Sequence, residues 1–145
     1  MSARFLEHIN VRTTRPRETT RFYVEVLGLN AGPYPGKTVP GAWIYDVRGT
    51  PVVHIVAIDP FDAEVQKKAD GATIARPLTS LNGTGVIDHV AFAADNYEEF
   101  RQRIEALGLP FRTRDAMPGL RQLYVMDPND VLIELNFHES PGQDT

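Results

Sequence analysis

An internal repeat constrains this chain more than any other feature of its sequence. The segment Val26–Leu29 reads VLGL, and Ala106–Leu109 reads ALGL 80 positions later. Ahead of them, His8 and His89 each open a short β-rich segment, and these two histidines are 81 positions apart. Landmarks that return in the same order at nearly the same offset indicate two copies of one structural unit.

A third landmark extends the match beyond the expected helices. The apolar segment Pro51–Val56 stands opposite Val131–Asn136, with His54 and Glu134 again 80 positions apart. Three ordered matches are too many for chance, so we expect the two halves of the chain to share one topology.

Each half is predicted to carry one amphipathic helix after its first strand. The first helix is expected over about Arg15 to Leu27, with Pro16 in its first turn. The second is expected over about Asn96 to Leu107. Its buried face is predicted from the helical spacing of Phe100, Ile104 and Leu107, and left-handed caps are expected at Gly28 and Gly108.

Three further strands are predicted in each half. They lie near Ala31 to Pro33, Ala42 to Val47, Pro51 to Ile58, Phe111 to Asp115, Gln122 to Met126 and Val131 to Phe137. The prediction is an α+β chain with βαβββ modules at residues 1–60 and 86–138. A polar linker at 61–85 and a tail at 139–145 complete it, and together the parts form one compact domain.

Composition excludes several classes of function. The 145 residues include no cysteine, which excludes disulfides, thiolate metal sites and cysteine nucleophiles. A formal charge of −4 argues against a general nucleic-acid partner. No apolar run approaches the roughly 20 residues of a membrane span, and Met1 to Arg12 lacks a signal-peptide core, so we expect a cytoplasmic protein.

Four side chains at repeat-equivalent positions are the candidates for chemistry: His8, His54, His89 and Glu134. A carboxylate or imidazole inside an apolar strand is costly to bury alone. Imidazole nitrogens with one carboxylate suit a divalent ion, namely Zn, Ni, Co, Mn or Fe. The set therefore predicts metal ligands at His8, His89 and Glu134, with His54 as a fourth ligand, a base or a pocket-lining residue.

Simpler interpretations exist for each of these residues taken singly. A lone histidine on a strand is usually a hydrogen-bonded core or surface residue, and Glu134 could pair with Arg12 or Arg121. The repeat favours the ligand set over these interpretations. His138 has no counterpart and is expected on the surface.

Other residues carry weaker signals. Trp43 is expected to pack in the core, while Tyr124 could donate a proton or a hydrogen bond to a substrate. Arg12 and Arg121 could instead clamp an anionic substrate.

The motifs together resemble the vicinal oxygen chelate superfamily over about Arg4 to Phe137. This superfamily includes glyoxalase I, fosfomycin-resistance thiol transferases, methylmalonyl-CoA epimerase, extradiol dioxygenases and bleomycin-resistance proteins. The motifs that carry the resemblance are EHIN at 7–10, RFY at 21–23 before LGL at 27–29, DHVAF at 88–92, and DPN at 127–129 leading to IEL at 133–135.

The resemblance implies two βαβββ modules that form a cupped mixed β-sheet around a metal. The first strand of each module supplies one ligand and the last strand of the second supplies a glutamate, which match His8, His89 and Glu134. Where glyoxalase I commonly has glutamate, this chain has His54. The family turn Asp-Pro-Asn-Gly ends here in Asp130, which must adopt a conformation that glycine usually takes.

The function implied is that of a divalent-metal-dependent lyase or isomerase of the glyoxalase type. It would act on a small substrate with neighbouring oxygens through a metal-stabilised enediolate or alkoxide, with His54, Glu134 and Tyr124 as catalytic residues. One alternative is a non-haem Fe(II) extradiol-type dioxygenase, and another is a ligand-binding protein of the bleomycin-resistance kind. The resemblance also implies a homodimer with a small-molecule substrate, while the composition argues against a nucleic-acid or a membrane partner.

Overall fold

The computed structural model describes residues 6–35, 40–59, 83–84, 87 and 89–138. The chain divides into two units, Met1–Leu81 and Asn82–Thr145. Of the predicted linker at 61–85, only residues 83 and 84 are among the described residues. The predicted tail at 139–145 lies outside them. Among the described helices, none is long and apolar enough to span a membrane.

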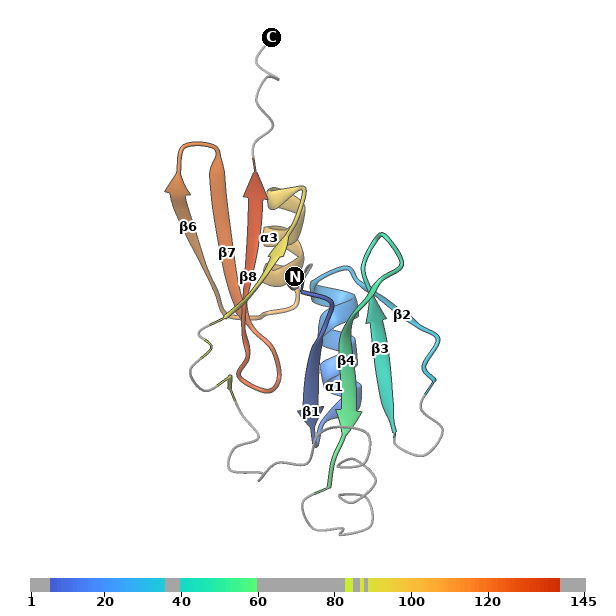
Figure 1. Cartoon of the computed structure of the whole chain (residues 1–145). Coiled ribbons are helices and arrows are strands. Elements are labelled where there is room, and N and C mark those ends of the chain that lie inside the picture. Colours follow the sequence, from blue (N-terminus) through green and yellow to red (C-terminus); the bar gives the residue numbers. More distant parts are fainter. Residues whose placement is uncertain (1–5, 36–39, 60–82, 85–86, 88, 139–145) are drawn as a thin grey trace. The chain divides into compact units, whose positions relative to one another are not determined.

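The first unit is a four-stranded mixed sheet with one helical segment (Figure 1). Its elements are β1 (Ile9–Thr13), α1 (Pro16–Arg21), η1 (Phe22–Val26), β2 (Asn30–Gly32), β3 (Gly41–Tyr45) and β4 (Pro51–Ala57). The strand order is β1-β4-β3-β2. Strand β1 runs parallel to β4, and the other neighbours are antiparallel.

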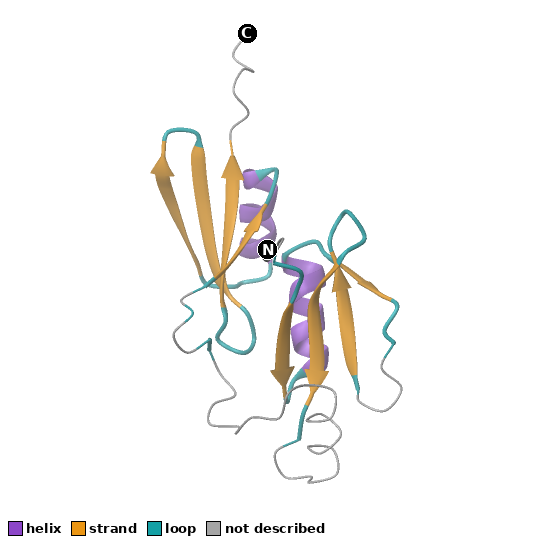
Figure 2. Cartoon of the chain, viewed as in Figure 1, coloured by secondary structure: helices purple, strands orange, loops and turns teal. Residues whose placement is uncertain are grey.

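The second unit repeats this topology (Figure 2). Its elements are β5 (Val90–Ala93), α3 (Tyr97–Ala106), β6 (Phe111–Met117), β7 (Leu120–Met126) and β8 (Leu132–His138). The strand order is β5-β8-β7-β6, with β5 parallel to β8 and the other neighbours antiparallel.

The structure thus confirms the α+β class and the βαβββ order of both halves. Most strand ends differ from the prediction by only one or two residues, as element boundaries generally do. One difference bears on the site: β1 begins at Ile9 and β5 at Val90, so His8 and His89 each lie immediately before a strand and not within it.

Each unit has its own core on one face of its sheet. In the first unit the fully buried side chains include Tyr23 of η1, Ile44 of β3 and Ile55 of β4. In the second they include Ile104 of α3 and Leu123 of β7. Successive side chains of a strand point to opposite faces of the sheet. The neighbours of these buried residues along each strand therefore lie on the face opposite the core.

The helices differ from the prediction in two respects. The first segment is α-helical only to Arg21 and continues as a five-residue π-helix, Phe22–Val26. On α3, Leu107 was expected on the buried face but is 44% exposed, because the helix ends at Ala106 and Leu107 is already its cap. Both segments end as predicted, with Gly28 and Gly108 at φ values of 69° and 66°.

Candidate functional site

Two of the predicted ligands, His54 and Glu134, each lie in the middle of a row of side chains, at equivalent positions in the two sheets. In the first unit, Asn10 of β1, His54 of β4 and Trp43 of β3 stand side by side in the strand register. In the second, Glu134 of β8 stands between Ala91 of β5 and Tyr124 of β7. In both cases the middle strand places its polar side chain on the face opposite the core, since the neighbouring residues along that strand are buried.

Three aromatic rings stack in the first unit. The His8 and His54 ring centroids lie 3.9 Å apart with an interplanar angle of 19°. On its other side, His54 stacks on Trp43 at 4.2 Å and 6°. Trp43 is half-buried in this stack, so the expectation that it packs in the core is wrong. Instead, it fixes the plane of the His54 ring.

The His54 imidazole is held in its neutral form. Its Nε2 atom is buried and has no hydrogen-bond partner among the described residues. Burial lowers the pKa of His54 below its ordinary value of 6.5, and the nearby His8 lowers it further, against the opposing influence of the Pro51 backbone and Glu7. A neutral imidazole with an unused ring nitrogen is a donor atom suited to a metal ion or to a proton.

His89 and Glu134 form the equivalent pair in the second unit. His89 Nε2 lies 3.4 Å from Glu134 Oε2, and the glutamate side chain is only 9% exposed. His89 precedes β5, whose parallel pairing with β8 sets Ala91 opposite Glu134. The same arrangement of first and last strands brings His8 onto His54 in the first unit.

Two amide side chains hold the other carboxylate oxygen. Glu134 Oε1 accepts hydrogen bonds from Gln122 Nε2 at 3.0 Å and from Asn136 Nδ2 at 2.7 Å. Gln122 Nε2 also donates to Asn136 Oδ1 at 2.9 Å, and Gln122 Oε1 accepts from the Tyr124 hydroxyl at 3.0 Å. Each amide therefore has a defined orientation within a closed polar network.

This network keeps Glu134 ionised. Burial alone would raise the pKa of Glu134, but the Tyr124 hydroxyl, the two amides and His89 together lower it below its ordinary value. Burial and the Glu134 charge raise the pKa of Tyr124, while Arg114 on β6 opposes that rise. At neutral pH the site therefore presents a carboxylate beside a phenol that keeps its proton.

The turn before β8 fixes the position at which this strand begins. Asp127 Oδ1 accepts hydrogen bonds from the backbone nitrogens of Asn129 at 2.7 Å and Val131 at 2.9 Å. Asp130 has a φ of 60°, so it takes the left-handed conformation expected at this position of the turn.

A comparison with protein families bears on what such a site is for. The model of the Glyoxalase/Bleomycin resistance protein/Dioxygenase superfamily matches residues 5–135 of the chain. The chain belongs to this superfamily. Within the curated proteins no sequence matches the chain.

Solved structures of the superfamily's fold cover almost the whole chain. Lactoylglutathione lyase from Agrobacterium tumefaciens is 20% identical with a TM-score of 0.62, covering 94% of this chain and 96% of that one. The fosfomycin resistance protein FosX from Listeria monocytogenes is 19% identical with a TM-score of 0.63, covering 94% of each chain. A mutant of FosX was solved with Mn(II) and 1S,2S-dihydroxypropylphosphonic acid.

A third structure is that of a binding protein. TnmS3, an antibiotic binding protein from Streptomyces sp. CB03234, is 17% identical with a TM-score of 0.61, covering 96% of this chain and 99% of that one. At these identities the likeness establishes the fold alone. The superfamily fold therefore serves both catalysis and binding, and the chain's own residues must decide between them.

The structure places the four predicted ligands of this superfamily member in two pairs, one in each unit. Among the described residues, no group of three or more histidine, aspartate or glutamate side chains is gathered as a metal site. Arg121 does not pair with Glu134, since its guanidinium lies 4.1 Å from the Tyr97 ring centroid and 3.7 Å from Glu98. His138 is exposed, as expected.

Sequence reasoning missed Arg114 and the hydrogen-bonding roles of Gln122 and Asn136. The signal for Arg114 was its strand periodicity with Arg112, which places two basic side chains on one face of β6. Their relation to Tyr124 depends on the β6–β7 register, which sets Arg112 opposite Tyr124 and Arg114 opposite Gln122.

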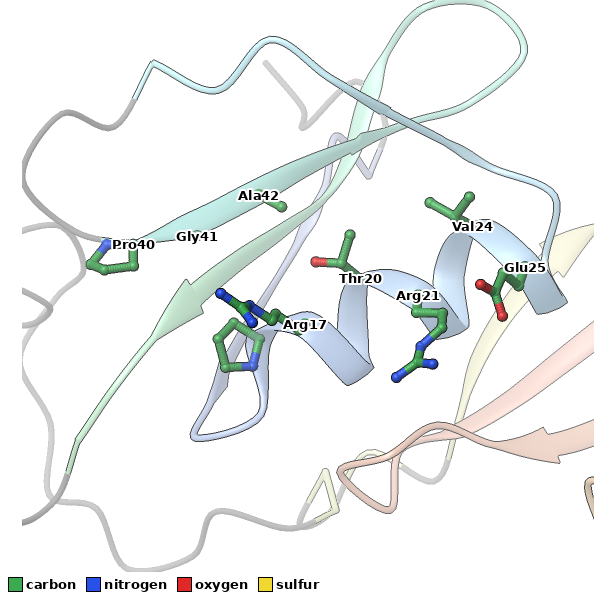
Figure 3. Close-up of a pocket in the computed structure, with 9 residues that line it drawn as sticks. Arg17, Thr20, Arg21, Val24, Glu25, Pro40, Gly41 and Ala42 are labelled. Carbon is green, nitrogen blue, oxygen red and sulfur yellow. The ribbon is translucent and has the colours of Figure 1, made fainter.

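A hollow of about 610 Å³ lies elsewhere on the first unit, between α1–η1 and the start of β3 (Figure 3). Its lining includes Arg17, Arg21 and Glu25 from the helical segment and Gly41 from β3. None of the four predicted ligands lines it. We therefore assign the candidate chemistry to the open faces of the sheets and not to this hollow.

Proposed function

We propose that this chain is a divalent-metal-dependent enzyme of the lyase or isomerase type that acts on a small substrate with neighbouring oxygens. One observation supports the proposal above the others. In both units, the histidine before the first strand contacts the polar side chain in the middle of the last strand, as His8 does with His54 and His89 with Glu134.

The donor atoms of these two pairs fit a divalent ion. Imidazole nitrogens and one carboxylate oxygen are ligands for Zn, Ni, Co, Mn and Fe. His54 Nε2, which has no hydrogen-bond partner within the described part of the chain, supports the same assignment, because buried polar atoms normally have partners. Glu134 supports it because its lowered pKa keeps it ionised, as a metal ligand must be. We propose His8, His89 and Glu134 as ligands, with His54 as a fourth ligand or as the base.

A bound divalent ion would act as a Lewis acid toward two neighbouring substrate oxygens. The chain's own residues have separate roles in this proposal. His54, neutral at pH 7, accepts a proton if it is not a ligand. Tyr124 keeps its proton at neutral pH, and to donate a hydrogen bond to substrate it would turn its hydroxyl away from Gln122 Oε1, its present acceptor.

The first test is elemental analysis of protein purified without chelator, for the wild type, Glu134→Ala and a control, Glu25→Ala. Glu25 is an exposed glutamate on η1, so its loss should leave metal content unchanged. We expect about one equivalent of metal per chain in the wild type and the control, and a large loss in Glu134→Ala.

The identity of the metal separates the remaining functions. A non-redox ion supports the lyase or isomerase, whereas Fe(II) with uptake of O₂ would favour the dioxygenase. A wild type that stays empty after metal is offered would contradict the metal enzyme and favour a ligand-binding protein.

Trp43 offers an independent test, because it is the only tryptophan of the chain and stacks on His54 at 4.2 Å. We expect Co(II) to quench its fluorescence in the wild type, since the ion would bind within a few ångströms of the ring. His54→Ala should respond much less, whereas the exposed control His138→Ala should respond like the wild type. Equal quenching in all three proteins would remove His54 from the proposed ligand set.

We also propose a homodimer, on the superfamily resemblance alone. Light scattering during size-exclusion chromatography distinguishes a dimer of this 16.2 kDa chain from a monomer.

A further inference from the structure

The hydrogen bonds at Glu134 divide its two oxygens into different roles. An ionised carboxylate offers about four acceptor positions, two on each oxygen. On Oε1, donors from Gln122 and Asn136 occupy both positions, at 3.0 Å and 2.7 Å. Oε2 instead faces His89 Nε2 at 3.4 Å.

We propose that Gln122 and Asn136 are positioning residues that make Glu134 a one-oxygen ligand, with Oε2 alone open to a metal ion. This inference rests on the proposed function, because it concerns the same ion. A carboxylate that binds through one oxygen leaves one more position on the ion for substrate oxygens or water than a carboxylate that binds through both.

Gln122 is the central residue of this arrangement. Its side chain is buried, with 8% of the residue exposed, and its amide joins three other side chains. The Tyr124 hydroxyl donates to Gln122 Oε1, which leaves the Nε2 hydrogens for Glu134 and Asn136. Without this amide, Oε1 of Glu134 loses one of its two amide donors, and the terminal torsion of the side chain gains freedom to rotate.

The burial of the site explains why these donors matter. Glu134 is 7% exposed, so water cannot readily replace a missing amide donor. Removing Gln122 would let Oε1 turn toward the ion, and the carboxylate would bind through both oxygens or with variable geometry.

The test is a Co(II) titration followed by visible absorption, which reports the coordination of the ion directly. It compares the wild type with Gln122→Met, which keeps the side-chain length and removes the donors. Gln102→Met is the matched control, since Gln102 is exposed on α3. We expect Co(II) binding to weaken by about 10-fold or more in Gln122→Met. We also expect its absorption bands to shift, while Gln102→Met matches the wild type.

A second variant, Asn136→Ala, tests the other donor at a less buried position. Thermal melts of the metal-free proteins show whether each variant folds. If Gln122→Met does not fold, Asn136→Ala decides the question by the same shift in the bands.

The outcomes separate this inference from the function on which it rests. If the wild type binds Co(II) and the folded variants give the same affinity and spectrum, the positioning role is wrong and the metal site stands. If the wild type itself binds no Co(II), the proposed metal site and this inference both fail.

Discussion

At the scale of the residue, His54 shows how its neighbours set the state of a side chain. Its ring lies between His8 and Trp43, and its Nε2 is buried. A charged imidazole would lose hydration in this position and would be repelled by a protonated His8. The ring is thus kept neutral and rigid before any ligand arrives, which reduces the cost of binding one.

This state has a measurable pH dependence. The pKa of His54 is lowered from 6.5 in the folded chain. As the pH falls below 6.5, the unfolded chain takes up a proton that the folded chain does not, so stability decreases through this window. In metal-free protein we expect the His54 ring to titrate below 6.5 by NMR. His54→Phe should lose less stability between pH 7 and 5 than the wild type in urea unfolding. A steeper loss in His54→Phe would contradict this assignment.

The sequence predicted the four ligand candidates but not the network around them. His8, His54, His89 and Glu134 are visible because they occupy repeated positions. The bonds of Gln122 depend on a cross-strand register that sets it opposite Asn136, and Tyr124 opposite Glu134. Register arises from the pairing of segments distant in sequence, so periodicity along one strand does not reveal it.

At the scale of the element, alternation and helical spacing predicted most of the architecture. Most strands, though not β2 and β6, follow from runs of apolar and β-branched residues, and the helix ends follow from Gly28 and Gly108. The π-helix at Phe22–Val26 was not predictable in this way. Its residues suit an α-helix equally well, and only packing against the sheet decides how many residues fill a turn.

Helix α3 allows a test of which side chains hold the second unit together. Ile104 is fully buried, whereas Leu107 at the helix end is 44% exposed. We expect Ile104→Ala to lower the free energy of unfolding by about 2–5 kcal/mol, because it leaves a cavity. Leu107→Ala should change it by only about 0.5 kcal/mol. Urea unfolding followed by circular dichroism gives both values, and similar costs would mean that α3 packs differently.

At the scale of the whole molecule, the proposed ligand set draws on both units. His8 and His54 belong to Met1–Leu81, and His89 and Glu134 to Asn82–Thr145. A ligand that binds only the folded chain stabilises it, by about 2.7 kcal/mol at a free concentration 100-fold above Kd. One ion that needs both units would therefore stabilise the chain only when both pairs are intact.

Thermal unfolding with and without Mn(II) measures this dependence. We expect the wild type to gain stability with Mn(II), and His8→Ala and Glu134→Ala each to lose most of that gain. His138→Ala, an exposed histidine, serves as the control and should keep it. If His8→Ala kept the full gain while Glu134→Ala lost it, the ion would belong to the second unit alone.

The π-helix accounts for a small irregularity in the repeat. From the histidine to the helix start the two halves have equal lengths, since Pro16 follows His8 by the same eight positions as Tyr97 follows His89. Counted from the histidine to the glycine that follows the helix, Gly28 or Gly108, the first half is one residue longer. The extra residue therefore lies inside the helical segment. There a wider turn absorbs it, whereas in a strand it would reverse the face of every later side chain. The helix thus tolerates the insertion or deletion of a residue, so the two copies could diverge in length there. Such a change leaves His54 on the face of its sheet that is equivalent to the face on which Glu134 lies in the second sheet.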